Sequence, residues 1–267
     1  MGTPLHQTAA ALRQALAPLL PGLEVDVVAS IESTNSELLA RAAAGASAPC
    51  LLVAEQQTRG RGRLGRSWQS SAGASLTFSL ALPLARADWS GLSLAVGVAL
   101  ADALDPHAAP PRIGLKWPND LWLVDAPGRG RKLGGILIET VNVGASRIAV
   151  IGCGINMLPQ PAPGLAQGYA CLQEIDAQAG AASALATIAA PLVRALQDFE
   201  AAGFVVFADA YRRRDLLRGQ SVTTTDVRLP AGTAEGVDEQ GGLLLRGGGG
   251  VHRIVSGEVS VRLPGAP

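Results

Sequence analysis

Apolar and polar residues follow two different periods along the chain. Short apolar or alternating runs bounded by turn residues predict strands at 24–30, 51–54, 76–80, 113–116, 121–124, 136–139 and 147–152. Longer runs with apolar residues on one helical face predict helices at 5–20, 33–45, 90–104, 183–202 and 204–213. Pro191 is expected to kink the helix at 183–202. Strand and helix periods therefore alternate through most of the chain.

The pattern changes from Leu216 onward. Short runs with strand character alternate with Gly and Asp turns, and these runs lie at 221–224, 243–245 and 259–261. This pattern predicts a small β-barrel-like appendage of about fifty residues. We therefore expect a main domain over residues 1–215, with an N-terminal helical segment at 1–24, and a second domain over residues 216–267.

The segment Gly60–Arg66 alternates three glycines and three arginines with one leucine, and it lies between two predicted strands. Glycine lets the backbone approach a ligand closely, and arginine presents a planar fork of donors that fits carboxylate or phosphate oxygens. The segment therefore predicts a mobile cationic flap that wraps an anion.

Other interpretations of the flap are a dinucleotide-binding G-x-G-x-x-G turn, a P-loop with Arg66 in the lysine position, and an RNA-binding Arg/Gly patch. The first two need a tight turn from strand to helix, whereas residues 55–59 separate the strand from the first glycine and a strand-like run follows. Arg/Gly patches usually occur in disordered sequence. The flap between strands remains the preferred interpretation.

Four further polar segments are candidates for ligand contacts. Ser33-Thr34-Asn35 begins a predicted helix, so it is either a simple cap or a polar cluster for a small neutral ligand. Trp117–Asp120 follows a strand, at a place where ligand groups often lie. Lys132 directly precedes the glycine pair Gly134-Gly135, and Gly152–Asn156 ends another strand with small residues.

Composition limits the class of protein. The 267 residues carry no formal net charge and 4% aromatic residues, which argues against a nucleic-acid-binding module. Three cysteines without a C-x-x-C pair indicate a reducing, cytoplasmic location, and three scattered histidines offer no metal cluster. The sequence shows no signal peptide or apolar run long enough to span a bilayer, so we expect no membrane association.

Taken together, these motifs resemble those of biotin protein ligases. The matching segments are Glu55–Thr58 followed by Gly60–Trp68, Lys116–Asp120, Lys132–Leu137 and Gly152–Asn156, preceded by Ser33-Thr34-Asn35. Each motif is weak alone, but five in the same order are specific, and the resemblance covers residues 25–262.

The resemblance implies an α+β fold with a mixed sheet related to class II aminoacyl-tRNA synthetases, and a C-terminal SH3-like barrel. It also implies a two-step ligase reaction. Biotin and MgATP would give biotinyl-AMP and pyrophosphate, and a lysine of a biotin carboxyl carrier domain would then attack the adenylate to form an amide.

The resemblance also implies roles for individual residues. Catalysis would use Arg63, Lys132 and Asp120. Biotin would contact Ser33, Thr34, Asn35, Gln57, Arg61, Gly62, Arg63, Lys132, Gly135 and Gly154. The nucleotide would contact Arg63, Arg66, Trp68, Asn119, Lys132 and Asn156. No separate tight metal site is expected, because Mg²⁺ would arrive with ATP.

Alternatives remain within and outside this fold. A lipoate or octanoate ligase would share the architecture, but those relatives lack the Gly-Arg flap. The segment before Val25 is too short for a DNA-recognition domain, so we expect no specific DNA binding. The sequence leaves open whether the protein forms a homodimer.

Overall fold

A computed structural model describes residues 5–106, 109–144, 146–160, 168–255 and 261–262 of the chain. Its largest element is a seven-stranded sheet with the order β1-β2-β5-β9-β8-β7-β6. Strands β1 and β2 are parallel, and the other neighbours are antiparallel. The strands are β1 (Glu24–Ile31), β2 (Cys50–Gln57), β5 (Ser75–Pro83), β6 (Ile113–Lys116), β7 (Asp120–Ala126), β8 (Arg129–Val143) and β9 (Ser146–Asn156). The sheet is therefore mixed, as expected.

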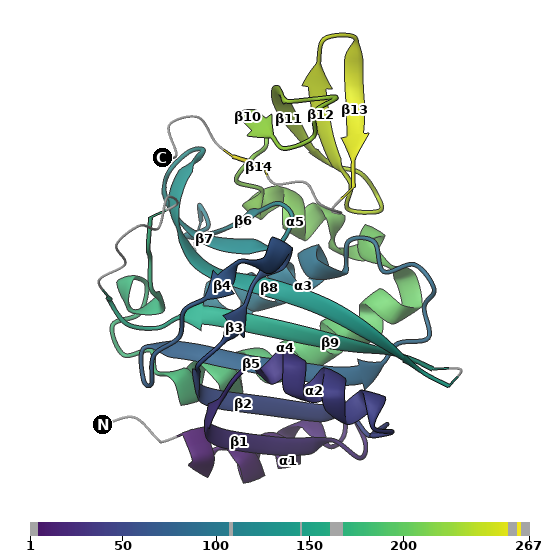
Figure 1. Ribbon diagram of the computed structural model, residues 1–267. Coiled ribbons are helices and arrows are strands. Elements are labelled where there is room, and N and C mark those ends of the chain that lie inside the picture. Colours follow the sequence, from purple (N-terminus) through teal and green to yellow (C-terminus); the bar gives the residue numbers. More distant parts are fainter. Residues whose placement is uncertain (1–4, 107–108, 145, 161–167, 256–260, 263–267) are drawn as a thin grey trace.

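Helices cover both faces of this sheet (Figure 1). Helix α2 (Thr34–Ala43) lies in front, whereas α3 (Leu92–Leu104) and α4 (Ala181–Ala202) lie behind and pack against each other. Alternate residues of β2 show why. Leu51 and Val53 belong to the apolar cluster that includes α3 and α4, and Leu52 packs with α2 in a second cluster.

Several elements differ from the sequence-based expectations. The predicted helix at 5–20 is a short 3₁₀ turn (Leu5–Gln7) and α1 (Ala9–Leu16), followed by turns. Strand β8 begins at Arg129 and runs through Gly134-Gly135. Helix α4 continues through Pro191 without a break, and α5 (Ala208–Arg214) follows a 3₁₀ turn (Phe204–Phe207).

The C-terminal part forms a second, antiparallel sheet with the order β13-β12-β11-β10-β14. Its strands are β10 (Ser221–Thr224), β11 (Ala231–Val237), β12 (Leu243–Gly247), β13 (Gly250–Ile254) and β14 (Val261–Arg262). Within the described residues its outer strands do not pair with each other, so the expected closed barrel is not found. Most of the predicted strand at 259–261 lies outside the described residues.

Contacts join the two sheets. The buried Trp117 donates its indole N–H to the carbonyl oxygen of Gly241 at 3.1 Å. The amide of Leu216 donates to Leu115 O at 3.0 Å. Buried residues of β12, such as Leu243, belong to the same apolar cluster as α3 and α4. Among the described helices, none is long and apolar enough to cross a membrane.

Candidate functional site

The Gly-Arg segment folds as a small hairpin rather than as an irregular loop. Strands β3 (Gly60–Arg61) and β4 (Ser67–Trp68) pair across a 3₁₀ turn at Arg63–Gly65. Gly60 has no room for a side chain, because a Cβ there would clash with the carbonyl oxygen of Trp68. Leu64 lies in the turn at φ 58° and is 50% exposed. The next element is strand β5, so the segment lacks the following helix that a dinucleotide-binding turn or a P-loop requires.

A cluster of neutral polar side chains lies at the N-terminus of α2. Ser33 caps the helix, and its hydroxyl accepts a long hydrogen bond from the Ser36 amide at 3.4 Å. The amide and the hydroxyl of Thr34 both donate to Gln57 Oε1, at 2.7 and 3.0 Å. Ser79 Oγ lies 2.7 Å from Thr34 Oγ1. Ser33 is therefore a helix cap, as the first alternative expected, and further polar side chains gather beside it.

Asn35 connects this cluster to strand β8. Its Nδ2 donates to Leu137 O at 3.1 Å and to Glu139 Oε2 at 3.0 Å, and its Oδ1 lies 2.5 Å from Ser79 Oγ. A Cβ at Gly152 would clash with the Asn35 amide, so the glycine leaves the space that Asn35 fills. Both N–H groups of Asn35 thus have protein acceptors. We define Thr34, Asn35, Gln57 and Ser79 as the polar cluster.

Glu139 links the polar cluster to the hairpin. Its Oε2 accepts from Asn35 and also pairs with Arg61 Nη2 at 2.7 Å. The hairpin contacts the main sheet a second time through Arg63, whose Nη1 donates to Asn119 Oδ1 at 3.2 Å. Burial lowers the pKa of the Arg63 guanidinium below its usual range. Of the arginines predicted to bind anions, Arg61 therefore lies beside β8 and Arg63 beside the turn that precedes β7.

Lys132 and Asp120 face each other from adjacent strands. Lys132 Nζ lies 2.7 Å from Asp120 Oδ1, and the Asp120 side chain is only 12% exposed. The same Nζ lies 5.9 Å from the centre of the Trp68 ring. Gly135 borders the pair, because a Cβ there would lie 3.4 Å from Lys132 Nζ. The ammonium of Lys132, the carboxylate of Asp120 and the indole of Trp68 thus lie next to one another.

Trp68 lies flat against strand β9. A Cβ at Gly154 would lie 2.5 Å from Trp68 Cε2, so only glycine at this position leaves space for the indole. The indole nitrogen is buried and has no hydrogen-bond acceptor. The space left by the small residues at the end of β9 is therefore filled by the indole of Trp68.

Asn119 and Asn156 fix the backbone around Lys132. Asn119 Nδ2 donates to Ile136 O at 2.7 Å, and the Ile136 amide donates to Asn119 O at 2.9 Å. The buried Asn156 donates to Lys132 O at 3.2 Å and to Ala170 O at 2.9 Å. Asn156 thus holds strand β8 to the segment that follows β9. Its amide N–H groups serve the protein itself.

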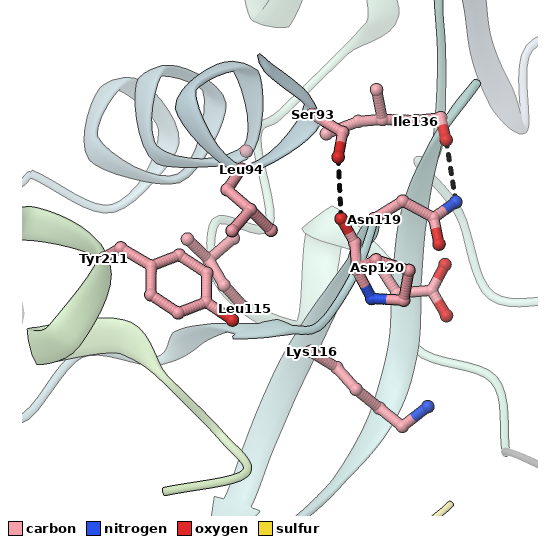
Figure 2. A pocket seen from close by; sticks show the side chains of 10 residues that line it. Ser93, Leu94, Leu115, Lys116, Asn119, Asp120, Ile136 and Tyr211 are labelled. Carbon is pink, nitrogen blue, oxygen red and sulfur yellow. Dashed lines mark hydrogen bonds between the residues drawn. The ribbon is translucent and has the colours of Figure 1, made fainter. Parts of the chain in front are cut away.

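A small cavity lies behind the Trp117–Asp120 turn (Figure 2). Helix α3 contributes Ser93, whose hydroxyl donates to Pro118 O at 2.8 Å, and α5 contributes the buried Tyr211. Asn119 and Asp120 lie at its edge. These contacts support the turn from behind and so place Asp120 opposite Lys132.

The structure brings most of the predicted residues together, and it adds two. Arg66 is exposed at the end of the hairpin turn, where its carbonyl accepts from the Gly62 amide at 2.7 Å. Sequence reasoning missed Ser79 and Glu139. The sequence pattern could have indicated Ser79, because Ser75, Thr77 and Ser79 alternate with apolar residues and so share one face of the strand. All three are buried in the structure. Among the described residues, no group of three or more His, Cys, Asp or Glu is placed to hold a metal ion.

Comparisons with known proteins agree with this geometry. Residues 27–156 match the biotin/lipoate A/B protein ligase family, and residues 219–262 match the biotin protein ligase C terminal domain. The chain is 37% identical to the biotin--[acetyl-CoA-carboxylase] ligase of Mycobacterium tuberculosis over 88% of each chain. It is also 37% identical to the bifunctional ligase/repressor BirA of Escherichia coli, over 91% of this chain and 75% of that protein.

A solved structure of a biotin protein ligase has the same fold. The biotin protein ligase from Aquifex aeolicus in complex with biotin and ATP superimposes with a TM-score of 0.75 at 28% identity, covering 90% of this chain and 98% of that chain. The sequence relatives and the solved structure thus match 88–91% of this chain, and the two family models match segments within it. The chain therefore belongs to the family of biotin protein ligases and is an ATP-dependent biotin ligase.

Proposed function

We propose that the charged side chains of Arg61, Arg63, Lys132 and Asp120 surround the place where the chain joins the carboxylate of biotin to the phosphate of AMP. The observation that carries this proposal is the placing of the hairpin arginines: Arg61 pairs with Glu139 beside the polar cluster, and Arg63 contacts Asn119, the neighbour of the Asp120 that holds Lys132. A carboxylate and an α-phosphate repel each other, so the site that joins them must supply positive charge in a fixed geometry. The acyl adenylate then needs shielding from water, which closure of the Gly-Arg hairpin provides.

The polar cluster is the proposed binding site for the ureido ring of biotin. The ring is neutral and carries both donors and acceptors, so it suits the hydroxyls of Ser33 and Thr34 and the amide of Gln57. Burial of Ser33, Thr34 and Asn35 excludes water that would compete for these bonds. Asn35 acts there by holding α2 against β8, since its N–H groups already donate to Leu137 and Glu139.

The nucleotide is placed on the side of the hairpin that carries Trp68. Gly154 leaves the space that the Trp68 indole fills, and the indole offers a stacking face for adenine. Arg66 and Asn119 supply donors for phosphate oxygens, and Asn156 fixes the main chain of Lys132. Gly62 and Gly135 allow backbone to approach the bound groups closely.

Lys132 and Asp120 have distinct proposed roles in the two steps. Lys132 lies where the carboxylate of biotin and the α-phosphate would meet, so it stabilises the charge of adenylation. Asp120 holds that ammonium at 2.7 Å and orients the incoming acceptor lysine, which must lose its proton before it attacks. Mg²⁺ would accompany ATP, and the oxygens of Asn119 and Asp120 are ligands of the type it prefers.

The acceptor is proposed to be the biotin carboxyl carrier domain of acetyl-CoA carboxylase or of a related carboxylase. This proposal follows the activity for which the Mycobacterium tuberculosis relative is named. We further propose that residues 1–215 form the catalytic domain, related to class II aminoacyl-tRNA synthetases. Residues 216–267 would then form a separate SH3-like domain, and the family match over 219–262 supports a separate C-terminal domain there.

We propose that the protein acts in the cytoplasm and binds no specific DNA sequence. The three cysteines are free and buried, in keeping with a reducing compartment. A gel shift with sequence-selective, salt-resistant retention of DNA would contradict the second statement.

Pyrophosphate exchange tests the proposed reaction without an acceptor. The purified chain is mixed with biotin, MgATP and labelled pyrophosphate, and incorporation of label into ATP is expected because the proposed adenylation groups all lie in this chain. Lipoate in place of biotin serves as the specificity control. Exchange that occurs with lipoate but not with biotin would overturn the substrate assignment.

A further inference from the structure

The basic residues of the chain are distributed unusually between lysine and arginine. Lys116 and Lys132 are the only lysines in the sequence, and all others of its 22 lysines and arginines are arginines. This matters because the proposed product is an acylating agent for amines. Protection of the chain from its own product presupposes that the chain forms biotinyl-5'-AMP, as proposed above.

An acyl adenylate discriminates between these two kinds of side chain. A neutral amine attacks the acyl carbon, the amide bond forms, the bond from that carbon to the phosphate oxygen breaks, AMP leaves, and the amine proton passes to solvent. A lysine reaches the neutral form to a small extent at neutral pH. An arginine guanidinium stays protonated and has no lone pair to offer. Arginines therefore provide surface charge without acceptor amines.

Neither lysine amine is available to attack the acyl carbon of biotinyl-5'-AMP. Lys116 is only 5% exposed, and its Nζ lies 5.2 Å from the centre of the Trp122 ring. Lys132 would lie beside the acyl group, but its Nζ pairs with Asp120 Oδ1 at 2.7 Å. An ammonium whose proton is held by a carboxylate has no lone pair for the acyl carbon.

The thiols are withheld as well. Cys50, Cys153 and Cys171 are all buried. Burial, with a smaller contribution from the charge of Asp26, raises the pKa of Cys50 to about 11. Burial also raises the pKa of Cys153 and of Cys171. The thiolate is the reactive form, so these side chains do not offer thioester formation as an alternative.

We propose that the chain is a poor acceptor of its own activated biotin. Biotinyl-5'-AMP that leaves the site passes over a surface of arginines and reaches amines on other molecules. Retention of the intermediate by the hairpin and the scarcity of lysine side chains then act separately. The first keeps the acyl group for the carrier domain, and the second keeps the enzyme unmodified.

The test adds one exposed lysine and measures intact mass and modified peptides. Arg59→Lys lies just before the hairpin, at a side chain that is 77% exposed, and Arg228→Lys lies between β10 and β11, at one that is 86% exposed. Each variant and the parent chain are incubated with biotin and MgATP, and separately with synthetic biotinyl-5'-AMP. Albumin in the same tube serves as the lysine-bearing reference.

With synthetic biotinyl-5'-AMP, we expect albumin and both variants to gain biotinyl groups, with the label on the new lysine, while the parent gains none on lysine. Labelling of Lys116 or Lys132 in the parent, to the extent seen for the added lysines, would overturn the inference. So would variants that stay unlabelled although an amine-reactive ester modifies their new lysine. If only the arm with biotin and MgATP gives no labelling and pyrophosphate exchange is also absent, the proposed function fails and the inference stands on the synthetic arm.

Discussion

The polar cluster and the Gly-Arg hairpin border the same site but are held in place very differently. In the cluster, Thr34 and Asn35 are each 3% exposed, Ser79 is fully buried, and hydrogen bonds join four elements of the fold. In the hairpin, Arg61 keeps 43% of its side chain exposed. The cluster is fixed by the core, whereas the hairpin extends over it.

This difference corresponds to two tasks. A neutral ring gains most from donors and acceptors that are already in place, because a preorganised site needs no further ordering when the ring binds. A reactive anhydride needs a cover that opens for substrates and closes over the intermediate. The cluster should therefore govern biotin affinity, and the hairpin should govern the lifetime of the intermediate.

The largest expected effect comes from Lys132→Ala. The change removes the cation at the point where two anions converge, and loss of one such group typically lowers the rate by ~10²–10³. Single-turnover formation of biotinyl-AMP measures this loss. Arg59→Ala is the matched control, since it removes a cation beside the hairpin from outside the proposed site. If Lys132→Ala left adenylation nearly normal, Lys132 would have no role in that step beyond its ion pair with Asp120.

A smaller effect is expected from Arg63→Gly, and it should concern retention rather than synthesis. The change removes a contact to the bound phosphate, worth ~1.5–3 kcal/mol for a hydrogen bond to a charged group, and it adds backbone freedom that makes closure of the hairpin harder. Arg61 and Lys132 remain, so adenylation continues. Released biotinyl-AMP should then label added albumin, in a manner that weakens on dilution. Arg63 has no role in retention if albumin is labelled no more than with the parent at matched adenylation rates.

Sequence patterns predicted the seven strands of the main sheet, the main helices and most residues of the candidate site, because each of these has a local signature, whereas β3, β4, β11 and β13 were not predicted. Short apolar or alternating runs predicted the strands of the main sheet, and the polar segment Ser33-Thr34-Asn35 predicted the start of α2, which Ser33 caps. The motifs at Lys116–Asp120 and Lys132–Leu137 were recognisable because their glycines and charges are adjacent in the chain.

Other features depend on contacts between distant residues. Glu139 joins Asn35 and Arg61, which lie 104 and 78 positions away, and no local pattern encodes that pairing. The double pairing of Asn156 with Lys132 and Ala170 is equally non-local. Helix α4 is one helix through Pro191 and packs against α3, a helix far from it in the chain.

Ser79→Ala tests whether the cluster governs biotin affinity. The change deprives the buried Asn35 Oδ1 of its 2.5 Å partner, and an unsatisfied buried group costs about 1–3 kcal/mol. We expect a lower free energy of unfolding by that amount and a raised KM for biotin, with the KM for ATP unchanged. Thr224→Val, which removes a hydroxyl that donates to Leu229 O at 2.6 Å in the C-terminal part, controls for lost stability alone. Equal changes in both KM values would place Ser79 outside the biotin site.

The smallest effect is expected from Glu139→Gln, which tests the connection between the two regions. Glutamine keeps an oxygen for Asn35 but removes the charge opposite Arg61, and an ion pair at this exposure is worth only ~0.2–1 kcal/mol. The hairpin should open more often, so trypsin should cleave after its arginines faster than in the parent chain. Salt screens the pair, so the difference should shrink at high ionic strength. Glu32→Gln, which breaks the exposed pair with Arg59, should leave cleavage within the hairpin unchanged. A rate increase that is equally large at high salt would mean that Glu139 positions Asn35 and does not hold the hairpin through its charge.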